Sequence, residues 1–406
     1  MTTVGRPGPV VLALPEDMLR DEVEIPDRPP IPPLAEEPDP GAIQAMFELL
    51  KEAASPVAIV GGADWSPRAS HHFANFAFRY GIPVAAAFRR QDAICNTCQV
   101  YAGQLGYGPN PRLQQRIRDA DLILAIGPRL GEATTDGYTL ITPDHPGQTL
   151  VHVHPDPNEI GRVYHADLPI CADMGEFAEM LDDWIDPDLV RFSCGVDAHR
   201  EWLEWSEPKP REDVKLDLGP CVAAMRERLP ENTIVCNGAG NFSGWWHRYW
   251  RYGPMPTQLA PTSGTMGYGL PASVAAAIRF KDRHVVCVAG DGDFLMNGQE
   301  LATAAQYGAD LLVIIADNAS YGTIRMHQER EYPKRISATE LRNPDFAALA
   351  RAFGGWATTV ETTEEFTPAL DEALKLKGIR LIHCKTDVEQ ISNATTITKL
   401  REKAKA

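Results

Sequence analysis

Apolar segments alternate with amphipathic segments along two long stretches of the chain, residues 41–185 and 214–406. The apolar segments predict strands, and the segments between them have the spacing of amphipathic helices. In the first stretch, the strands are expected at 56–62, 82–86, 120–129 and 149–156. Strands that are apolar throughout and separated by helices are typical of parallel sheets covered on both faces. The pattern therefore predicts an α/β fold with two doubly wound, parallel-sheet domains.

Two segments without apolar periodicity separate these stretches from their surroundings. Residues 27–40 are rich in proline, which removes backbone donors and favours an extended spacer. Residues 206–213 combine proline with charge and mark a second boundary. We therefore divide the chain into an N-terminal segment with its linker at 1–40, a middle domain at 41–185, a linker at 186–213 and a second domain at 214–406.

Composition narrows the range of partners. The chain has 406 residues, enough for two or three domains that each bury a core. Its formal net charge of −16 argues against nucleic acid or an anionic membrane as a main partner, because both require a basic surface. We find no apolar stretch long enough to span a bilayer and no secretory signal, so we expect a cytoplasmic protein.

Pairs of cysteine and histidine residues are candidate metal ligands. Cys95 and Cys98 form the one close pair among eight cysteines, and no second pair stands at a spacing suited to zinc. His152 and His154 alternate along a predicted strand without a third ligand in view. For both pairs we favour a structural role over metal or redox chemistry.

A stronger candidate site lies at the ends of two predicted strands. Asp291 and Asn318 each follow such a strand, and the crossover helix between them is expected to begin at Asn297, with Glu300 as its capping partner. Both side chains would then lie at the carboxyl ends of parallel strands, where open α/β sheets bind ligands.

The chemistry of this strand edge suits a metal-bound phosphate group. A carboxylate, an amide oxygen and a backbone carbonyl are ligands for a hard cation such as Mg²⁺. Gly290 and Gly292 would let the turn approach a ligand closely and point its N–H groups at an anion. The sequence therefore predicts a magnesium-bound diphosphate at this edge.

Several motifs together resemble a known superfamily. GDGDF at 290–294 is followed by ADN at 316–318, with TSGTMGYGLPASVAAAIRF upstream and NASYGTIR downstream. This set is similar to the thiamin-diphosphate motif of the acetolactate synthase and pyruvate decarboxylase superfamily. The segment 57–161 resembles the middle domain of that family, so the resemblance covers nearly the whole chain.

The resemblance implies roles for individual residues. Asp291, Asn318 and the backbone carbonyl of Ser320 would be Mg²⁺ ligands. The candidate catalytic residues act by orienting the cofactor: the Gly264 carbonyl would accept from its 4′-amino group, and Met266 would press the aminopyrimidine against the thiazolium. On residue type alone, Met266 would instead be a core methionine. The other expected cofactor contacts are Asn241, Thr265, Gly290, Gly292, Asp293, Tyr321 and Gly322.

The sequence departs from the family pattern at two positions and in one larger respect. Asp293 stands where serine is frequent and Asp317 where asparagine is usual, so we expect a more negative site, with the Asp293 side chain turned away from the diphosphate. Residues 4–19 resemble only the last strand of the family's pyrimidine-binding domain. No glutamate can be assigned the role of activating the cofactor, and Glu300 is interpreted as a helix cap.

Three functions follow as hypotheses. We favour a thiamin-diphosphate- and Mg²⁺-dependent lyase or transferase that decarboxylates or ligates a 2-keto acid. This chain would supply the diphosphate half-site and be inactive without a pyrimidine domain, working as a homo-oligomer or with a separate subunit. The alternative is a non-catalytic or partner-dependent binding subunit. A nicotinamide or flavin oxidoreductase ranks last because the G-x-G-x-x-G turn is absent; FAD in the middle domain is a candidate that no residue supports.

Two further groups have open interpretations. Trp245 and Trp246 would line an interface or simply pack, and we weigh these equally. Arg325, His327 and Arg330 could cover the site or recognise a carboxylate, although a solvated loop is slightly favoured.

Overall fold

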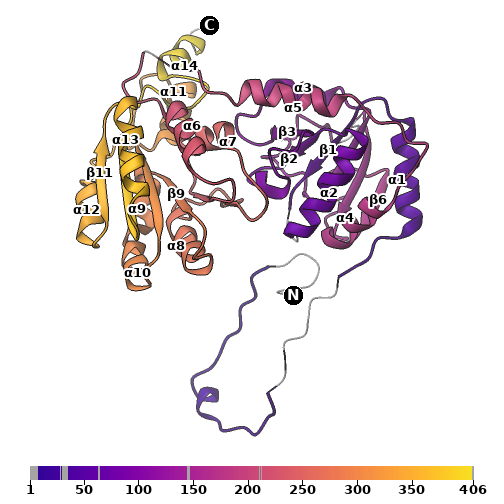
Figure 1. Ribbon diagram of the computed structural model, residues 1–406, viewed down its shortest axis with the longest axis horizontal. Coiled ribbons are helices and arrows are strands. Elements are labelled where there is room, and N and C mark those ends of the chain that lie inside the picture. Colours follow the sequence, from indigo (N-terminus) through magenta and orange to yellow (C-terminus); the bar gives the residue numbers. More distant parts are fainter. Residues whose placement is uncertain are drawn as a thin grey trace.

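Two parallel sheets, each covered by helices on both faces, form the body of the molecule (Figure 1). The computed structural model describes residues 8–27, 29, 35–62, 65–143, 147–209, 211 and 213–404. Within these residues each sheet has six strands, and all paired strands are parallel. The predicted α/β class with two doubly wound sheets is therefore confirmed.

The first sheet has the strand order β3-β2-β1-β4-β5-β6. Its strands are β1 (Pro56–Val60), β2 (Val84–Ala86), β3 (Tyr101–Gln104), β4 (Leu122–Ile126), β5 (Thr149–His154) and β6 (Leu168–Cys171). The helices are α1 (Pro40–Glu52), α2 (Pro67–Tyr80), α3 (Pro111–Arg118), α4 (Met174–Asp183) and α5 (Cys194–Trp205), with the short turn η2 (Gln91–Ala93). Leu124 faces the core beneath α1, α2 and α4, whereas Ile123 faces the core beneath α3.

The second sheet has the order β11-β12-β10-β9-β7-β8. Its strands are β7 (Ile234–Asn237), β8 (Gln258–Leu259), β9 (Val285–Gly290), β10 (Leu311–Asp317), β11 (Trp356–Val360) and β12 (Ile379–Lys385). The helices are α6 (Leu218–Arg228), α7 (Ser243–Tyr249), α8 (Gly269–Arg279), α9 (Asp291–Asn297), α10 (Leu301–Gln306), α11 (Gly322–Glu331), α12 (Phe346–Ala352), α13 (Thr363–Leu374) and α14 (Ile397–Lys403), with the short turn η3 (Gly298–Glu300) between α9 and α10. Alternate residues of β10 pack under α6 and α13 on one face and under α8 and α12 on the other.

Side-chain caps explain where several helices begin. Ser66 accepts a hydrogen bond from the Ala69 N–H, and Asn110 accepts one from the Arg112 N–H. A proline follows each cap at the first helical position, where its missing N–H costs nothing. Thr362 and Glu365 form a complete capping box at the start of α13.

Hydrogen bonds join the two sheets through the segment after β2. Asp92 Oδ2 accepts from the backbone N–H groups of Thr257 and Gln258 at 3.0 and 3.1 Å. Asn96 and Tyr252 exchange a pair of hydrogen bonds, each of 2.9 Å. These contacts are buried, so they place the β8 side of the second sheet firmly against the first domain.

The segment 186–213 is more than a connection. We expected a linker there, but α5 lies within it and packs against β3 through Trp202 and Tyr101, whose rings are 4.8 Å apart. Residues 210 and 212 of this segment lie outside the described part of the chain. The division of the chain into domains otherwise stays a prediction.

Residues 8–27 extend away from the body as an arm with the short turn η1 (Met18–Arg20) (Figure 1). We expected a strand here, but residues 8–19 form none. A strand needs a neighbouring strand to satisfy its backbone, and these residues pair with no other described segment. Apolar side chains of the arm are exposed: Val10, Val11, Leu12, Leu14, Leu19, Val23 and Ile25. Residues 1–7, 28 and 30–34 lie outside the described chain.

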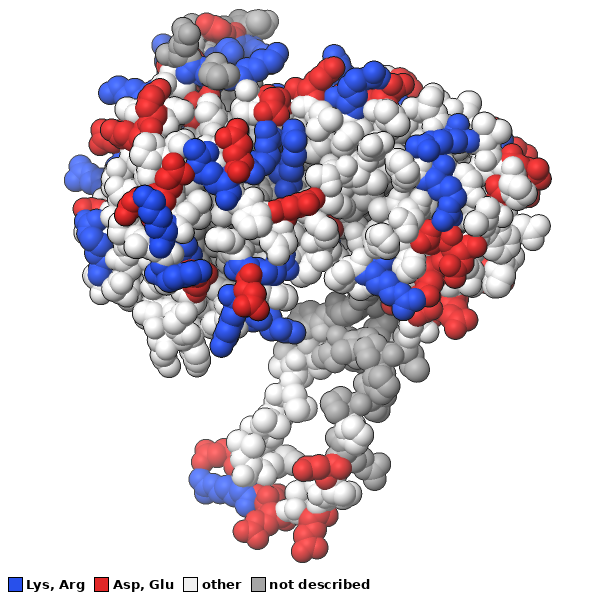
Figure 2. Space-filling model, in the orientation of Figure 1, with Lys and Arg blue, Asp and Glu red and all other residues white. Residues whose placement is uncertain are grey.

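The surface carries both signs of charge. On the face shown in Figure 2, acidic and basic side chains are interspersed over both domains and do not gather into one basic area. In the described part of the chain, no helix has the length and apolar character needed to cross a membrane.

Candidate functional site

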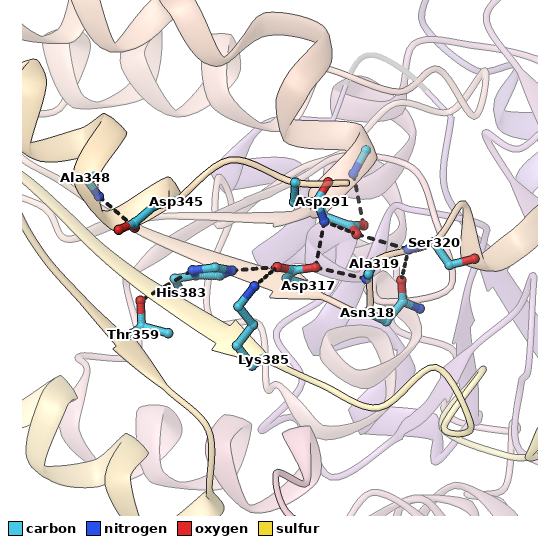
Figure 3. Close-up of polar contacts among 12 residues, drawn as sticks. Asp291, Asp317, Asn318, Ala319, Ser320, Asp345, Ala348, Thr359, His383 and Lys385 are labelled. Carbon is cyan, nitrogen blue, oxygen red and sulfur yellow. Dashed lines mark hydrogen bonds and ion pairs between the residues drawn. The ribbon is translucent and has the colours of Figure 1, made fainter. Parts of the chain in front are cut away.

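Two neighbouring strands bring Asp291 and Asn318 to one edge of the second sheet. β9 and β10 pair in parallel and end directly before these residues. Asp291 Oδ2 and Asn318 Oδ1 accept hydrogen bonds from the same backbone N–H, that of Ser320, at 3.2 and 3.1 Å (Figure 3). The structure thus brings the side chains of Asp291 and Asn318 together, as the strand-end argument expected, beside the backbone of Ser320.

The crossover helix begins earlier than expected. α9 starts at Asp291 itself, whose Oδ1 accepts from the Gly292 N–H at 2.9 Å. Asn297 ends α9 and stands at the N-cap position of η3, but the predicted capping hydrogen bond is absent and its Nδ2 donates to the Gly267 carbonyl at 2.8 Å instead. Glu300 makes no capping hydrogen bond and accepts from the Thr303 hydroxyl instead.

A cavity of about 240 Å³ opens at this edge. It is lined by eleven of the twelve predicted site residues: Asn241, Gly264, Met266, Gly290, Asp291, Gly292, Asp293, Asn318, Ser320, Tyr321 and Gly322. Thr265 is the exception, because its hydroxyl lies 2.8 Å from that of Ser263 on an exposed part of the loop.

Sequence reasoning missed the apolar wall of this cavity. Phe242, Trp245, Ile324 and Ile391 line it, and so does Thr386. The rule that selected Asp291 could have found two of these segments, because residues 238–242 follow β7 and Thr386 follows β12 at the same edge. Of the two tryptophans that we weighed, Trp245 lines the cavity and Trp246 is fully buried in the core.

The Asp291 carboxylate is buried among three donors. Besides Gly292 and Ser320, Asn343 Nδ2 donates to its Oδ2 at 2.8 Å. Burial raises the pKa of Asp291 to about 6, and the neighbouring Asp317 carboxylate acts in the same direction. A buried carboxylate with a raised pKa is one whose negative charge would gain from a nearby cation.

Asp317 lies beside Asp291 and has hydrogen-bond partners of its own (Figure 3). Its Oδ2 accepts from His383 Nε2 and Lys385 Nζ, both at 2.7 Å. Burial alone would raise the pKa of Asp317, but these two partners hold it well below its ordinary value. The extra negative charge that we expected in the site is therefore compensated by Lys385.

Asn343 links the two carboxylates. Its single amide nitrogen donates to Asp291 Oδ2 at 2.8 Å and to Asp317 Oδ1 at 2.7 Å. No pattern in the sequence indicated this residue, because it lies in the loop before α12, far from both aspartates along the chain. It keeps two acidic side chains in contact through one shared donor.

Asp293 also lines the cavity, and its side chain is bound to two backbone N–H groups. Its Oδ1 accepts from the backbone N–H groups of Gly267 and Ala239 at 2.8 and 3.1 Å. Burial raises the pKa of Asp293 to about 6, although these donors and the Arg89 guanidinium oppose the shift. A Cβ atom on Gly238 would lie only 2.0 Å from Asp293 Oδ2, so the carboxylate requires glycine there.

The glycines of the turn serve packing as well as ligand approach. A Cβ atom on Gly292 would lie 2.6 Å from the Tyr321 ring, and one on Gly290 would lie 2.8 Å from the Phe242 ring. The Gly292 N–H donates to Asp291 Oδ1 at 2.9 Å.

The donor set fits a magnesium ion. In the described residues no group of three or more His, Cys, Asp or Glu side chains is arranged to hold a metal. A cation at Asp291 would therefore draw its other ligands from the Asn318 amide, the Ser320 backbone and an oxygen-rich ligand, which is the mixed oxygen shell that Mg²⁺ adopts beside phosphates.

The other candidates lie away from this cavity. Arg325 is buried and pairs with Glu329 at 2.9 Å, which leaves it unsuited to recognising a ligand. His327 and Arg330 follow on the same helix, α11, and do not line the cavity.

The Cys95 thiol lies 3.0 Å from the Thr97 hydroxyl, and Cys98 is a free thiol. His152 and His154 have ring centroids 6.2 Å apart on β5.

A second cavity of about 800 Å³ lies at the carboxyl edge of the first sheet. It is lined by residues at or just after the ends of β1, β2, β4 and β5, including Gly62, Arg90, Arg129 and His154. Gly264 lines both cavities, so the loop after β8 separates them.

Comparison with known proteins identifies the family. Residues 238–384 match the family model "Thiamine pyrophosphate enzyme, C-terminal TPP binding domain", and residues 43–181 match "Thiamine pyrophosphate enzyme, central domain". The chain belongs to the superfamily of thiamine pyrophosphate enzymes. The resemblance proposed from the GDGDF and ADN motifs is thus confirmed.

Relatives of this chain include acetolactate synthase large subunits. The subunit from Parasynechococcus marenigrum (strain WH8102) is 32% identical over 361 residues, which are 86% of this chain and 58% of that protein. The isozyme 2 large subunit of Escherichia coli (strain K12) is 27% identical over 399 residues, 94% of this chain and 69% of that protein. This chain therefore spans less than two thirds of the first of these relatives.

The fold also matches a solved structure. Benzoylformate decarboxylase from Polynucleobacter necessarius superposes with a TM-score of 0.77 at 23% identity, covering 96% of this chain and 72% of that one. At this identity the match supports the fold alone.

Proposed function

We propose that this chain binds thiamin diphosphate and Mg²⁺ and takes part in the decarboxylation or carboligation of a 2-keto acid, as the acetolactate synthase relatives suggest. One observation carries the proposal. Asp291 Oδ2 and Asn318 Oδ1 accept hydrogen bonds from the same Ser320 N–H at the carboxyl ends of two adjacent parallel strands. They line the cavity together with most of the predicted cofactor contacts.

Each residue of the site has a role in this proposal. Asp291, Asn318 and the Ser320 carbonyl would hold the metal, which in turn would hold the diphosphate. The Gly264 carbonyl would accept a hydrogen bond from the aminopyrimidine and Met266 would support that ring. When bound, the cofactor supplies the nucleophilic carbon that adds to the keto group. The apolar wall formed by Phe242, Trp245, Ile324 and Ile391 would exclude water from this reaction.

The described lining of the cavity offers no candidate for the activating acid. Among the described residues that line the cavity there is no glutamate. We therefore propose that a pyrimidine-binding domain supplies it. This domain would belong either to a longer form of the same protein or to a separate subunit. The exposed apolar arm of residues 8–27 supports such a contact, because covering side chains such as Val11 and Leu12 with a partner lowers the free energy of the complex.

Calorimetric titration with thiamin diphosphate tests the proposal. We expect binding in the presence of Mg²⁺, loss of binding with EDTA, and loss of binding in Asp291→Ala. Asp282→Ala is the matched control, because Asp282 is exposed and precedes β9 where Asp291 follows it. If the wild-type chain binds no thiamin diphosphate at any Mg²⁺ concentration, the proposal is wrong.

Turnover assays separate the enzyme from its alternative, a non-catalytic binding subunit. The purified chain alone should not consume pyruvate or other 2-keto acids, and addition of a pyrimidine domain from a relative should produce turnover if the chain is catalytic. Turnover by the chain alone would contradict the proposed half-site. FAD is a candidate ligand only for the second cavity, and the absorbance of the purified protein near 450 nm would reveal it.

A further inference from the structure

One short helix holds the loop that carries Met266. We propose that Asp293 and Asn297 of α9 are positioning residues, which fix the loop 264–267 relative to the metal ligand at the start of the same helix. The inference rests on the proposed function only for the role of Met266. The hydrogen bonds of Asp293 and Asn297 are observed in the structure and do not depend on that function.

Both backbone groups of Gly267 are bound by α9. Its N–H donates to Asp293 Oδ1 at 2.8 Å, and its carbonyl accepts from Asn297 Nδ2 at 2.8 Å. Residues four apart on a helix lie on the same face, so the two side chains hold Gly267 from one side. Gly267 is the neighbour of Met266, whose position they therefore set.

The loop has little other support. Residues 262–265 are exposed, and a Cβ atom on Gly264 would meet nothing within 4 Å. At Gly267, by contrast, φ is +81° and a Cβ atom would lie 2.7 Å from the Met296 Cβ, so the backbone is packed directly against α9. The loop is anchored again at Pro261, whose carbonyl accepts from the Arg89 guanidinium.

Asp293 joins a second loop to the same point. Its Oδ1 also accepts from the Ala239 N–H at 3.1 Å, two residues before Asn241. One oxygen thus ties together the loop after β7 and the loop after β8, both of which line the cavity. Because α9 begins with Asp291, a single rigid element would set the spacing between the metal end and the aminopyrimidine end of the site.

At position 293, the positioning role needs only one oxygen that accepts hydrogen bonds, and not the negative charge. Both N–H groups donate to Oδ1, so asparagine at position 293 could keep both hydrogen bonds without the negative charge, whereas alanine loses them. Asn297→Asp keeps the shape of the side chain but cannot donate to the Gly267 carbonyl when ionised. These substitutions separate hydrogen bonding from charge and from bulk.

Two titrations measure the effect on binding: thiamin diphosphate with Mg²⁺, which uses both ends of the site, and inorganic pyrophosphate with Mg²⁺, which uses only the metal end. We expect Asn297→Asp, which loses one hydrogen bond, to weaken the binding of thiamin diphosphate about 10-fold, and Asp293→Ala, which loses two, to weaken it at least as much. Asp293→Asn should stay within about 3-fold of the wild type. Pyrophosphate should not weaken in any of the three variants.

A ligand-free measurement covers the case in which the chain binds no thiamin diphosphate. In spectra of protein labelled at the methionine methyl groups, the Met266 signal, assigned with Met266→Leu, should move in Asp293→Ala and Asn297→Asp but not in Asp293→Asn. A single cooperative melting transition in each variant would show that it is folded. The proposal is overturned if the Met266 signal is unchanged in both of the disruptive variants, if Asp293→Asn behaves like Asp293→Ala, or if both ligands weaken together.

Discussion

The two sheets share one architecture but differ in the chemistry of their carboxyl edges. In the first sheet, β1 is followed by glycine and β4 by Gly127 and Pro128, and arginines line the cavity. In the second sheet, β9 and β10 are followed by Asp291 and Asn318. The parallel fold creates a cavity at both edges, whereas the residues just after the strands decide what can bind there.

The second edge carries an electrostatic cost that the first does not show. Asp291, Asp293 and Asp317 are all buried within one turn of the strand ends, and each depends on backbone or side-chain donors. At the first edge, Gly62 and Gly127 pack so closely that a Cβ atom on Gly62 would lie 1.9 Å from the Gly127 carbonyl oxygen. The buried aspartates of the second edge thus need a network of donors, whereas the first edge is shaped by close backbone packing.

The largest expected effect concerns the charge at the metal edge. Asp291→Asn keeps the shape of the side chain but removes the charge that attracts a cation, so Mg²⁺-dependent affinity for thiamin diphosphate should fall about 100-fold or more. Arg129→Gln, at the carboxyl edge of the first sheet, should change this affinity less than about 2-fold. Calorimetric titration of both variants measures the contrast, and similar losses in the two would erase the distinction between the edges.

The next effect is a pH dependence of stability in the absence of metal. The pKa of Asp293 is raised to about 6 in the folded chain, above the value of about 3.9 for an unfolded aspartate, so the folded state binds this proton more tightly. The free energy of unfolding should therefore fall as pH rises from about 4 to about 6.

Asp293→Asn isolates that contribution. The variant should be nearly as stable as the wild type at pH 4 and more stable at pH 7, by up to about 3 kcal/mol. Urea denaturation in EDTA at a series of pH values gives the difference. A stability difference that is the same at every pH would show that the raised pKa is not the cause.

The shared amide comes third. Asn343→Leu removes the donor that links Asp291 to Asp317, which should lower the free energy of unfolding by about 2 kcal/mol and weaken Mg²⁺-dependent binding. Asn158→Leu, at an exposed position near the first edge, should cost less than about 0.5 kcal/mol. Equal costs in urea denaturation would show that Asn343 has no special part in the network.

The smallest effect belongs to the exposed partner of Asp317. The Lys385 side chain is 45% exposed, so Lys385→Met should cost only about 0.5 kcal/mol, and less in high salt. Denaturation with urea at low and high NaCl concentrations measures this. A cost above about 2 kcal/mol that salt does not reduce would mean that Lys385 is as important as the buried His383.

Local patterns were enough to predict the meeting of Asp291 and Asn318. Strand ends can be found from apolar runs, and neighbouring parallel strands must present their ends at the same edge. The same reasoning predicted both sheets, and the joint occurrence of GDGDF, ADN and GTMGYG predicted the family. Helix α5 within 186–213 was missed, because proline and charge nearby suggested a break while the helix packs through contacts with β3.

The sequence by itself therefore determined the two-sheet architecture, the family and the group of residues at the second edge, because these depend on short-range periodicity and on the order of elements. Only the tertiary structure decided the partners of those residues. Asn343 reaches Asp291 across 52 positions, and His383 reaches Asp317 across 66. The direction of Asp293, the start of α9 at Asp291 and the contact of Asn297 with Gly267 depend likewise on which donors and acceptors the folded chain brings within about 3 Å.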